Sequence, residues 1–564
     1  MGIIQFESVN CKDCCKCIGV CPVKSIEVKN HQANVVERDC ILCGNCTVVC
    51  PQNAKRSVNE LGSIRDLIHD GKRVIGSVAP SYAAYFDGCG FEAMSAALKK
   101  LGFSSVRETA EGAHLVKSQY EELLRKGEQA TVISTCCPTL NAYVQKHLPE
   151  AIPFLAPVLT PLQAHARLLH EEDPDAAIVF IGPCISKKEE CRKGGDGLCY
   201  ALTFDELADW LRETNTELVH GEPEDRCLSR FFPVTGGILE TMERLPQYDY
   251  IAIDGAENCM NALRDVVAGK ITNCFLEMSF CTGSCVGGPA FRKRELSLAS
   301  STLKVKKTAV DGEMPREQRP DFNVHAPQTL ETSFRDEQIY YDQPTEKQIA
   351  AIFRKMGKKS AADELNCGMC GYASCREKAI AVYFGRAEIS MCMPYMKKRA
   401  ESFSDKILAI TPNAILAVDL DMKVQQINHA ACQMFSLQVE DILGQSVSRI
   451  LDEFDFVEMV ANNKASMEKY NYLAEYNLYL KQSFYYDASA GIILCIMKNI
   501  TQEKQRKNQL MQHKTQVIGM ADSIAEKQLR IVHEIASLLG ESAAETKVAI
   551  AELKEAVMID DEER

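Results

Sequence analysis

No stretch of the 564-residue sequence is apolar over about twenty residues, the length that spans a bilayer. The first residues, MGIIQFESVNCKDC, also lack the basic segment and the apolar segment of a secretory leader. We therefore expect a cytoplasmic protein with no membrane partner. A chain of this length suggests about three to five domains.

Positive charge is scarce as well. Asp and Glu number 77 against 64 Lys and Arg, which gives a net charge of -13. Because nucleic-acid binding depends mainly on Lys and Arg contacts to phosphates, we expect no nucleic-acid partner. The 46% hydrophobic and 25% charged residues are typical of globular domains.

Cysteine is abundant, with 26 residues. In a reducing compartment these cysteines are better explained as metal ligands than as disulfides. Residues 1–57 contain the pattern Cys-x2-Cys-x2-Cys-x3-Cys-Pro twice. In bacterial ferredoxins with this pattern, three close cysteines bind one 4Fe-4S cluster and the fourth binds the other. The pattern predicts a two-cluster ferredoxin domain, with one cluster held by Cys11, Cys14, Cys17 and Cys50 and the other by Cys40, Cys43, Cys46 and Cys21.

A zinc ribbon is the alternative for this region, but it gives no role to the proline after each fourth cysteine. Cys15 falls outside the repeat and is interpreted as a spare thiol. Two segments between the cysteine runs alternate apolar and polar residues, which predicts a short hairpin over residues 25–29 and 33–37.

Residues 58–300 have an α/β pattern. Apolar runs separated by helical stretches predict parallel strands at 72–79, 131–134, 176–181 and 250–253. Ligands of such sheets bind beyond the carboxyl ends of the strands, and three cysteine segments lie there, at 134–138, 182–189 and 277–289.

The third segment contains two cysteines four residues apart. This spacing is expected to place Cys281 and Cys285 on one face of a helical turn, and the glycines that follow would let the backbone approach a bulky group. With one cysteine from each of the other two segments, the set could hold one 4Fe-4S cluster: Cys137, Cys184, Cys281 and Cys285. The alternative is that these cysteines pack as small buried hydrophobic residues.

The three segments resemble, in order, the three signature motifs of the iron-iron hydrogenases. The resemblance implies a two-lobed α/β domain with an H-cluster, in which a 4Fe-4S cluster is joined to a two-iron unit carrying CO and CN ligands. It also implies that Cys285 bridges to the two-iron unit, that Pro80 and Ser81 contact one cyanide, and that Lys187 binds the other. Cys136 would pass protons to the bridgehead amine. Without the motif, Lys187 would be read as a solvated surface lysine.

The sequence departs from the hydrogenase pattern beside the ligands. Gly182 and Ser279 stand where catalytic relatives have methionines, with Met278 displaced by one position. Two bulky, polarisable packing groups around the two-iron unit are therefore expected to be absent.

A second departure concerns the proton path. Where relatives have a glutamate, this chain has Gln119 and Tyr120, although Glu121 or Glu122 would fit after a one-residue shift. A broken relay would make turnover slow, while dihydrogen could still bind.

Residues 301–345 are polar and predict a linker or an extended wrap. Residues 346–400 contain Cys-x2-Cys-x4-Cys-x16-Cys, which resembles the small 4Fe-4S domain of corrinoid iron-sulfur proteins. This pattern predicts a third accessory cluster, with zinc as the alternative, held by Cys367, Cys370, Cys375 and Cys392.

Residues 401–502 resemble a PAS domain, with strands at 414–420, 423–427, 484–486 and 491–497 and no recognisable haem or flavin ligands. Residues 503–564 predict helices. An apolar seam there repeats every seven residues and consists of Val517, Ile524, Ile531 and Leu538. Such a seam suits either a homodimer coiled coil or a hairpin folded onto the chain's own PAS domain. Gly540 is expected to end this helix, and a capping box at 542–545 to begin a second one.

The whole architecture resembles the sensory, PAS-containing iron-iron hydrogenases of anaerobic metabolism. The resulting hypothesis is a hydrogen sensor that oxidises H2 reversibly and slowly. Its expected partners are a small redox carrier such as ferredoxin, hydrogenase maturation proteins, and a kinase or phosphatase. The alternatives are a metabolic ferredoxin-linked hydrogenase and a hydrogenase-like iron-sulfur protein without the two-iron unit.

Overall fold

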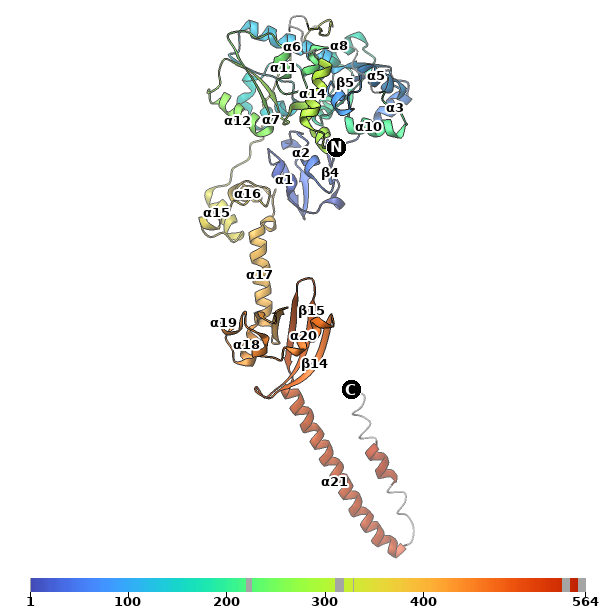
Figure 1. Cartoon of the computed structure of the whole chain (residues 1–564), viewed down its shortest axis with the longest axis vertical. Coiled ribbons are helices and arrows are strands. Elements are labelled where there is room, and N and C mark those ends of the chain that lie inside the picture. The colour runs from blue at the N-terminus through green and yellow to red at the C-terminus, as the bar shows by residue number, and fades with distance from the viewer. Residues whose placement is uncertain (1, 220–225, 310–318, 328, 540–547, 556–564) are drawn as a thin grey trace. The chain divides into compact units, whose positions relative to one another are not determined.

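The computed structural model describes residues 2–219, 226–309, 319–327, 329–539 and 548–555. The chain forms two compact units, Met1–Met396 and Lys397–Arg564, and each is described by itself (Figure 1). Among the described residues, no helix is both long enough and apolar enough to cross a membrane.

The predicted ferredoxin region contains two similar halves. Each cysteine run leads into one short helix, α1 (Lys16–Val20) or α2 (Asn45–Val49). The predicted hairpin is present as β2 (Ile26–Lys29) and β3 (Gln32–Val35). The ends of the region pair through β1 (Ile4–Phe6) and β4 (Lys55–Ser57), so the region closes on itself.

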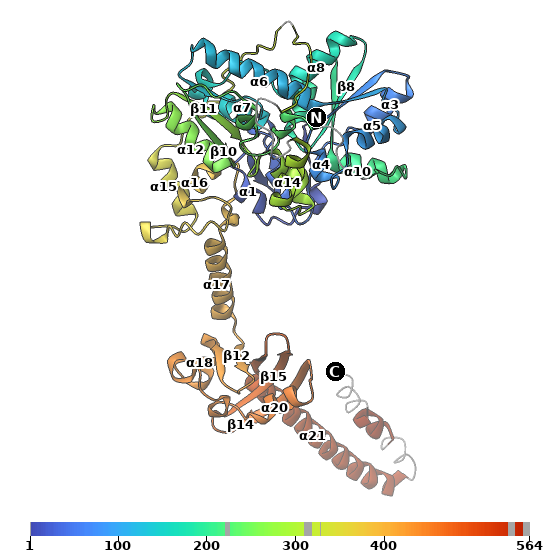
Figure 2. The same cartoon turned by 45° about the horizontal axis from the view of Figure 1, so that its top comes forward.

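Two parallel sheets form the central α/β region, as the sequence predicts. The first has the strand order β6-β5-β8-β9, and its strands are Ser105–Glu108, Val74–Val78, Ala177–Gly182 and Leu198–Thr203. The second has the order β10-β11-β7, with strands Asp249–Asp254, Cys274–Ser279 and Thr131–Ile133. Each sheet belongs to one lobe (Figure 2).

Helices cover both sheets. The first lobe contains α3 (Leu61–His69), α5 (Phe91–Lys100), α9 (Ser186–Lys193) and α10 (Phe204–Glu213). The second contains α7 (Pro138–His147), α11 (Gly237–Thr241) and α12 (Ala256–Val267). The only tryptophan of the chain, Trp210, is buried in the core of the first lobe.

Helices α6 (Thr109–Lys126) and α8 (Pro161–Glu172) pack closely against each other. A Cβ atom at Gly112 would lie 2.0 Å from the backbone oxygen of Pro161, so only glycine fits there. His165 is fully buried beside this contact, and its Nδ1 lies 2.8 Å from the Ser77 hydroxyl. Burial lowers the pKa of His165 to about 3, so its ring is neutral.

The segment after residue 300 is more integrated than a simple linker. Helix α14 (Leu298–Ala309) crosses the predicted boundary and buries Val305 in the core of the first lobe. Residues 319–327 and 329–341 run along the second lobe almost entirely without helix or strand. Leu330 is buried in that lobe's core, and its backbone oxygen accepts the Leu159 N–H at 2.9 Å. This part of the segment therefore packs against the second lobe.

The predicted 4Fe-4S domain contains α15 (Glu346–Lys355) and α16 (Cys375–Tyr383). Its apolar residues do not all pack within the domain itself. Part of its apolar surface packs with Ile18, Ile26 and Val28 of the ferredoxin region in one cluster, and these packing residues are Tyr372, Ala381, Ala387 and Met391. The backbone N–H of Val28 also donates to the oxygen of Arg386 at 2.8 Å. The two iron-sulfur regions therefore form one body.

The second unit contains the predicted PAS fold. Helix α17 (Met393–Ile410) leads to an antiparallel sheet of order β13-β12-β16-β15-β14, with strands Val424–Ile427, Ala414–Asp419, Ile492–Asn499, Leu478–Asp487 and Ser466–Leu473. Its helices are α18 (His429–Phe435), α19 (Val439–Ile442) and α20 (Phe454–Ala461). Sequence analysis missed β14, which is largely exposed and has no apolar alternation.

The unit ends in the long helix α21 (Thr501–Leu539), followed by a helix at 548–555. Three residues of the predicted seam, Val517, Ile524 and Ile531, are between 54% and 63% exposed. The described residues therefore do not cover this part of the seam. Gly540 and the capping box predicted at 542–545 lie outside the described residues.

Candidate functional site

One cavity of about 120 Å³ collects the residues of the three cysteine segments. Residues of both lobes line it, and most of its lining atoms are apolar. All eight residues predicted for the active site line it: Cys137, Cys184, Cys281, Cys285, Cys136, Lys187, Pro80 and Ser81. Segments that lie up to two hundred residues apart in the chain are thus brought to one place.

Strand ends explain this convergence. Pro80 and Ser81 follow β5, and Cys184 follows β8. Cys136 and Cys137 follow β7, with Cys137 as the residue before helix α7. Because the carboxyl ends of parallel strands lie at one edge of a sheet, the two sheets together present all the motifs toward the same cavity.

The third motif is built differently from the prediction. Cys281 lies in a turn after β11, and Cys285 lies in a separate 3-10 helix, Ser284–Gly287. Gly283 and Ser284 have positive φ angles of 80° and 58°, so the chain reverses between the two cysteines. The prediction of one shared helical turn was therefore wrong, although both thiols line the cavity.

Gly287 is required by the fold of this turn, and not by the close approach of a bulky group. A Cβ atom there would lie 1.7 Å from the backbone oxygen of Thr282. A substitution at this position would therefore break the turn that carries Cys285.

The thiols of the cavity are suited to iron. Burial raises the pKa of Cys285 to about 12 and raises that of Cys281 well above the ordinary value, and neighbouring thiolates raise both further. Buried thiols with raised pKa values become thiolates only with a strong compensating cation, which an iron-sulfur cluster supplies. Among the described residues, no three His, Cys, Asp or Glu side chains are close enough to share a single metal ion.

Two polar side chains point to an acceptor ligand in the cavity. The Ser81 hydroxyl is fully buried and has no hydrogen-bond partner among the described residues. Lys187 is also buried, which contradicts its reading as a solvated surface residue. Its ammonium group lies 2.6 Å from Glu190 and donates to the Thr160 hydroxyl at 3.1 Å. Burial alone would lower the pKa of Lys187, but the ion pair with Glu190 more than offsets this, so the pKa is raised.

Tyr120 lies beside Cys136, at the position where the sequence did not decide which residue replaces the glutamate of the relatives. Its hydroxyl lies 3.3 Å from the Cys136 sulfur and accepts the backbone N–H of Thr135 at 2.8 Å. Glu121 and Glu122 do not reach the cavity, because Glu121 accepts the Glu243 backbone N–H and Glu122 pairs with Lys126 near the surface. A tyrosine, and not a shifted glutamate, therefore adjoins the predicted proton-carrying thiol.

Glu277 is a functional candidate that sequence analysis did not identify. Its buried carboxylate accepts the backbone N–H groups of Gly236 at 2.8 Å and Leu239 at 3.0 Å. Burial raises its pKa to about 7, and its charge in turn raises the pKa of Cys136. The signal in the sequence was a carboxylate in an otherwise apolar strand, at the first position of the third motif.

The two departures from the hydrogenase pattern have different structural results. At Gly182, a Cβ atom would lie 2.4 Å from the ring of Phe180, which itself lines the cavity. Phe180 thus fills the space that a larger residue would need. At Ser279, the hydroxyl instead pairs with the Ser284 hydroxyl at 2.9 Å, which places a polar pair in the cavity wall.

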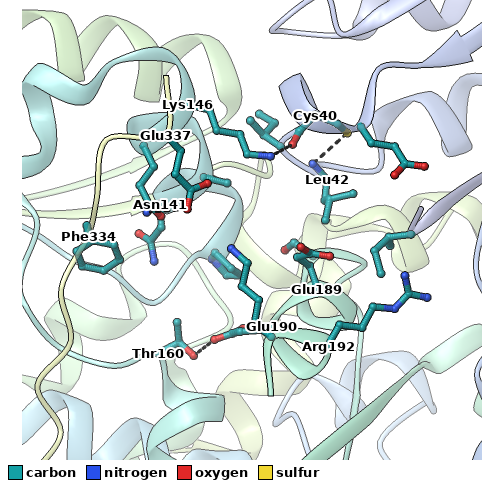
Figure 3. Close-up of a pocket in the computed structure, with 18 of the residues that line it drawn as sticks. Cys40, Leu42, Asn141, Lys146, Thr160, Glu189, Glu190, Arg192, Phe334 and Glu337 are labelled. Atoms are coloured by element: carbon teal, nitrogen blue, oxygen red, sulfur yellow. Dashed lines mark hydrogen bonds between the residues drawn. The ribbon is translucent and has the colours of Figure 1, made fainter. Parts of the chain in front are cut away.

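A second, larger cavity of about 550 Å³ lies on the other side of the Thr160–Glu190 pair (Figure 3). Thr160 donates to Glu190, and both line this cavity, whereas Lys187 lines the smaller one. Lys146 donates to the backbone oxygen of Cys40 at 2.9 Å in its wall. Glu190 is therefore the point at which this polar cavity comes next to the ion pair of Lys187.

The accessory cysteines also form groups. The four predicted ligands of the second ferredoxin cluster line a cavity of about 20 Å³, and they are Cys21, Cys40, Cys43 and Cys46. Another cavity of about 20 Å³ is lined by Cys367, Cys370, Cys375 and Cys392. For the first ferredoxin cluster, the charges of Cys11 and Cys14 raise the pKa of Cys17, so these three lie near one another.

Comparison with known families identifies four regions. Residues 72–251 and 245–289 match the C-terminal domain of the iron only hydrogenase large subunit. Residues 33–56 match the 4Fe-4S binding domain, residues 363–394 an Fe-S cluster family, and residues 403–471 the PAS fold.

Two curated relatives cover parts of the chain. The NADP-reducing hydrogenase subunit HndD of Solidesulfovibrio fructosivorans is 23% identical in an alignment of 360 positions that covers 49% of this chain and 61% of HndD. The cytosolic Fe-S cluster assembly factor NAR1 of Kluyveromyces lactis is 25% identical in an alignment of 188 positions that covers 29% of this chain and 40% of NAR1. The chain thus spans less than two thirds of either relative.

Among solved structures, the [FeFe]-hydrogenase HydA1 from Chlamydomonas reinhardtii aligns with 50% of this chain and 100% of its own, with 17% identity and a TM-score of 0.39.

Proposed function

We propose that this chain, which carries a domain of the iron-only hydrogenase large-subunit family together with iron-sulfur and PAS domains, is a hydrogen sensor with slow hydrogenase activity. One observation carries the proposal. Six residues from the three separated motifs, together with Pro80 and Ser81, line a single, largely apolar cavity. This cavity presents five thiols, one ammonium group and one hydroxyl without a hydrogen-bond partner among the described residues.

The residues present fit an H-cluster. Cys137, Cys184, Cys281 and Cys285 would hold its 4Fe-4S part, and the two-iron part would supply the binding and splitting of dihydrogen. Ser81 and Lys187 are the available hydrogen-bond donors for its anionic ligands, because an anion in an apolar cavity needs such partners.

Proton transfer would depend on Cys136. Its thiol lies at the cavity and its pKa is raised to about 12 by burial, so it holds its proton tightly. The thiol can exchange a proton with a base in the cavity, and Tyr120 holds its sulfur in position. Tyrosine is a far weaker acid than the carboxylate that catalytic relatives place on this route, and its own pKa is raised well above the ordinary value by burial. Slow turnover follows from this chemistry.

The second unit supports a signalling role. It contains a PAS fold, and Val517, Ile524 and Ile531 of the seam on α21 are left exposed by the described residues. We propose that this seam forms the homodimer contact and that a kinase or phosphatase reads the state of the unit. A small redox carrier such as ferredoxin would exchange electrons with the accessory clusters, and maturation proteins would insert the two-iron part in the cytoplasm.

The test is infrared spectroscopy of the anaerobically matured protein, followed by hydrogen uptake. We expect CO and CN bands in the wild type and in Cys136→Ala, with slow uptake in the wild type and none in the variant. Bands with rapid uptake would favour a metabolic hydrogenase instead.

Absence of the bands after maturation would refute the proposal. It would favour the second candidate, an iron-sulfur protein without a two-iron part, to which the similarity to NAR1 gives some weight.

A further inference from the structure

The 4Fe-4S domain touches the ferredoxin region next to predicted cluster ligands of both. Gly371, which follows the ligand Cys370, has a φ angle of 84°. A Cβ atom at Gly371 would lie 2.9 Å from the backbone nitrogen of Gly19 and 3.0 Å from the backbone oxygen of Cys15. Lys24 joins the two sides, since its ammonium group donates to the oxygens of Ile18 and Gly371, each at 3.0 Å. The two cysteine loops are thus in backbone contact.

A lysine is buried behind this contact. Lys378 of helix α16 is 1% exposed, and its ammonium group donates to the backbone oxygen of Glu388 at 2.9 Å. In the part of the chain that the structure describes, it forms no ion pair with a carboxylate. It lines the same small cavity as the four predicted ligands Cys367, Cys370, Cys375 and Cys392.

A buried ammonium group without a carboxylate partner is strongly unfavourable unless other negative charge is near. In the cavity that Lys378 lines, the source of such charge is the predicted cluster site. A 4Fe-4S cluster with four thiolates carries net negative charge, which also favours the charged form of a neighbouring lysine. The burial of Lys378 is therefore explained if its partner is the cluster itself.

The ferredoxin region repeats this arrangement on its own side. Lys55 is 2% exposed, and its ammonium group lies 3.5 Å from the sulfur of the predicted ligand Cys17. The Phe6 ring covers it at 5.2 Å, and it forms no ion pair with a carboxylate among the described residues. Two buried cations thus stand beside cluster thiols on either side of the contact.

We propose that Lys378 is a buried counter-cation for the iron-sulfur cluster held by Cys367, Cys370, Cys375 and Cys392, and that it raises the reduction potential of this cluster. Reduction adds one electron, donated by a reduced cluster of the adjoining ferredoxin region, and makes or breaks no bond. The added negative charge is stabilised by a nearby cation, most strongly where water is excluded. Lys378 therefore favours the electron on the side of helix α17, which begins at Met393 directly after the ligand Cys392.

The proposal is tested by redox titration of the full-length protein, with dithionite and mediators, followed by electron paramagnetic resonance. The signal of this cluster is the one that Cys375→Ser removes. Lys378→Gln can still donate to the Glu388 oxygen but has no charge. We expect it to lower the equilibrium constant for reduction of this cluster about tenfold, which is 59 mV for one electron, and to leave the other clusters unchanged.

Two controls separate charge from shape. Lys378→Arg keeps the charge and should retain the wild-type potential. Lys355→Met removes an exposed charge from the same domain, and solvent screening should leave the potential unchanged. An unshifted potential in K378Q with intact iron and sulfide content would overturn the proposal. So would loss of the cluster from both K378Q and K378M but not K378R, which would indicate a structural role.

This inference needs iron-sulfur clusters but no hydrogen chemistry. The titration uses neither H2 nor a two-iron part. A shift can therefore be measured in protein that fails the infrared test, and the two proposals succeed or fail separately.

Discussion

The buried carboxyl group of Glu277 gives a prediction that links stability and activity to pH. Burial raises its pKa from 4.5 to about 7. At about 1.4 kcal/mol for each pKa unit, this difference corresponds to roughly 3 kcal/mol. Between these two values the folded protein holds a proton that the unfolded chain has lost. The contribution of Glu277 to stability is therefore full below pH 4.5 and is lost as the pH rises through about 7.

The substitution Glu277→Gln should remove this dependence. Glutamine is neutral and can still accept the N–H of Gly236 or Leu239. Relative to wild type, the variant should gain roughly 3 kcal/mol between about pH 4 and about pH 8. Urea unfolding of the apoprotein, followed by Trp210 fluorescence, measures this gain in the α/β core.

Activity tests whether the same carboxyl group also carries protons. If it does, hydrogen uptake by the matured E277Q protein should fall about 10²–10⁴-fold, with loss of the pH limb near 7 and unchanged infrared bands. Glu257→Gln, at an exposed position of helix α12, is the matched control and should change neither quantity. An E277Q protein that keeps the pH limb and a rate within about threefold of wild type would refute the assignment.

Three further predictions concern neighbouring residues and use the same fluorescence assay. Lys187→Met leaves the Glu190 carboxylate buried without its cation and should destabilise the protein by about 3–5 kcal/mol. Adding Glu190→Gln to this variant should recover most of the lost stability. A Lys187→Met protein as stable as wild type would contradict the ion pair. Gly182→Met should lower stability by about 1–3 kcal/mol because its Cβ meets the Phe180 ring. Adding Phe180→Ala to this variant should relieve the overlap. Equal stability of the single and the double variant would show that the ring is not the obstacle. Tyr120→Phe removes the acceptor of a buried backbone N–H and should lower stability by about 1–3 kcal/mol. It should also slow hydrogen uptake, because the Cys136 thiol becomes free to move. Unchanged uptake would exclude a positioning role for the Tyr120 hydroxyl.

Cysteine spacing and strand periodicity carried most of the fold prediction. The repeat in residues 1–57, the apolar runs that became β5, β7, β8 and β10, and the PAS hairpin are local patterns, so the sequence shows them directly. The four cysteines around the cavity were named from motifs, and the structure places them along one cavity.

Other features depend on contacts that no local pattern records. The reversal between Cys281 and Cys285 depends on two residues with positive φ, of which Ser284 is not a glycine. The partners of Tyr120 and Glu277 lie on other segments, so their roles appear only when those segments meet. Helix α14 was hidden by the polar surroundings of the segment after residue 300.

The apolar cluster shared by the ferredoxin region and the 4Fe-4S domain has a consequence for building chimeras. A cut before residue 346 would remove Tyr372, Ala381 and Met391 and leave Ile18 and Val28 facing water. A fusion intended to transplant the PAS unit should therefore be joined within helix α17, after both iron-sulfur regions. Exchanges made at that joint would keep the iron-sulfur regions whole while the PAS unit is replaced.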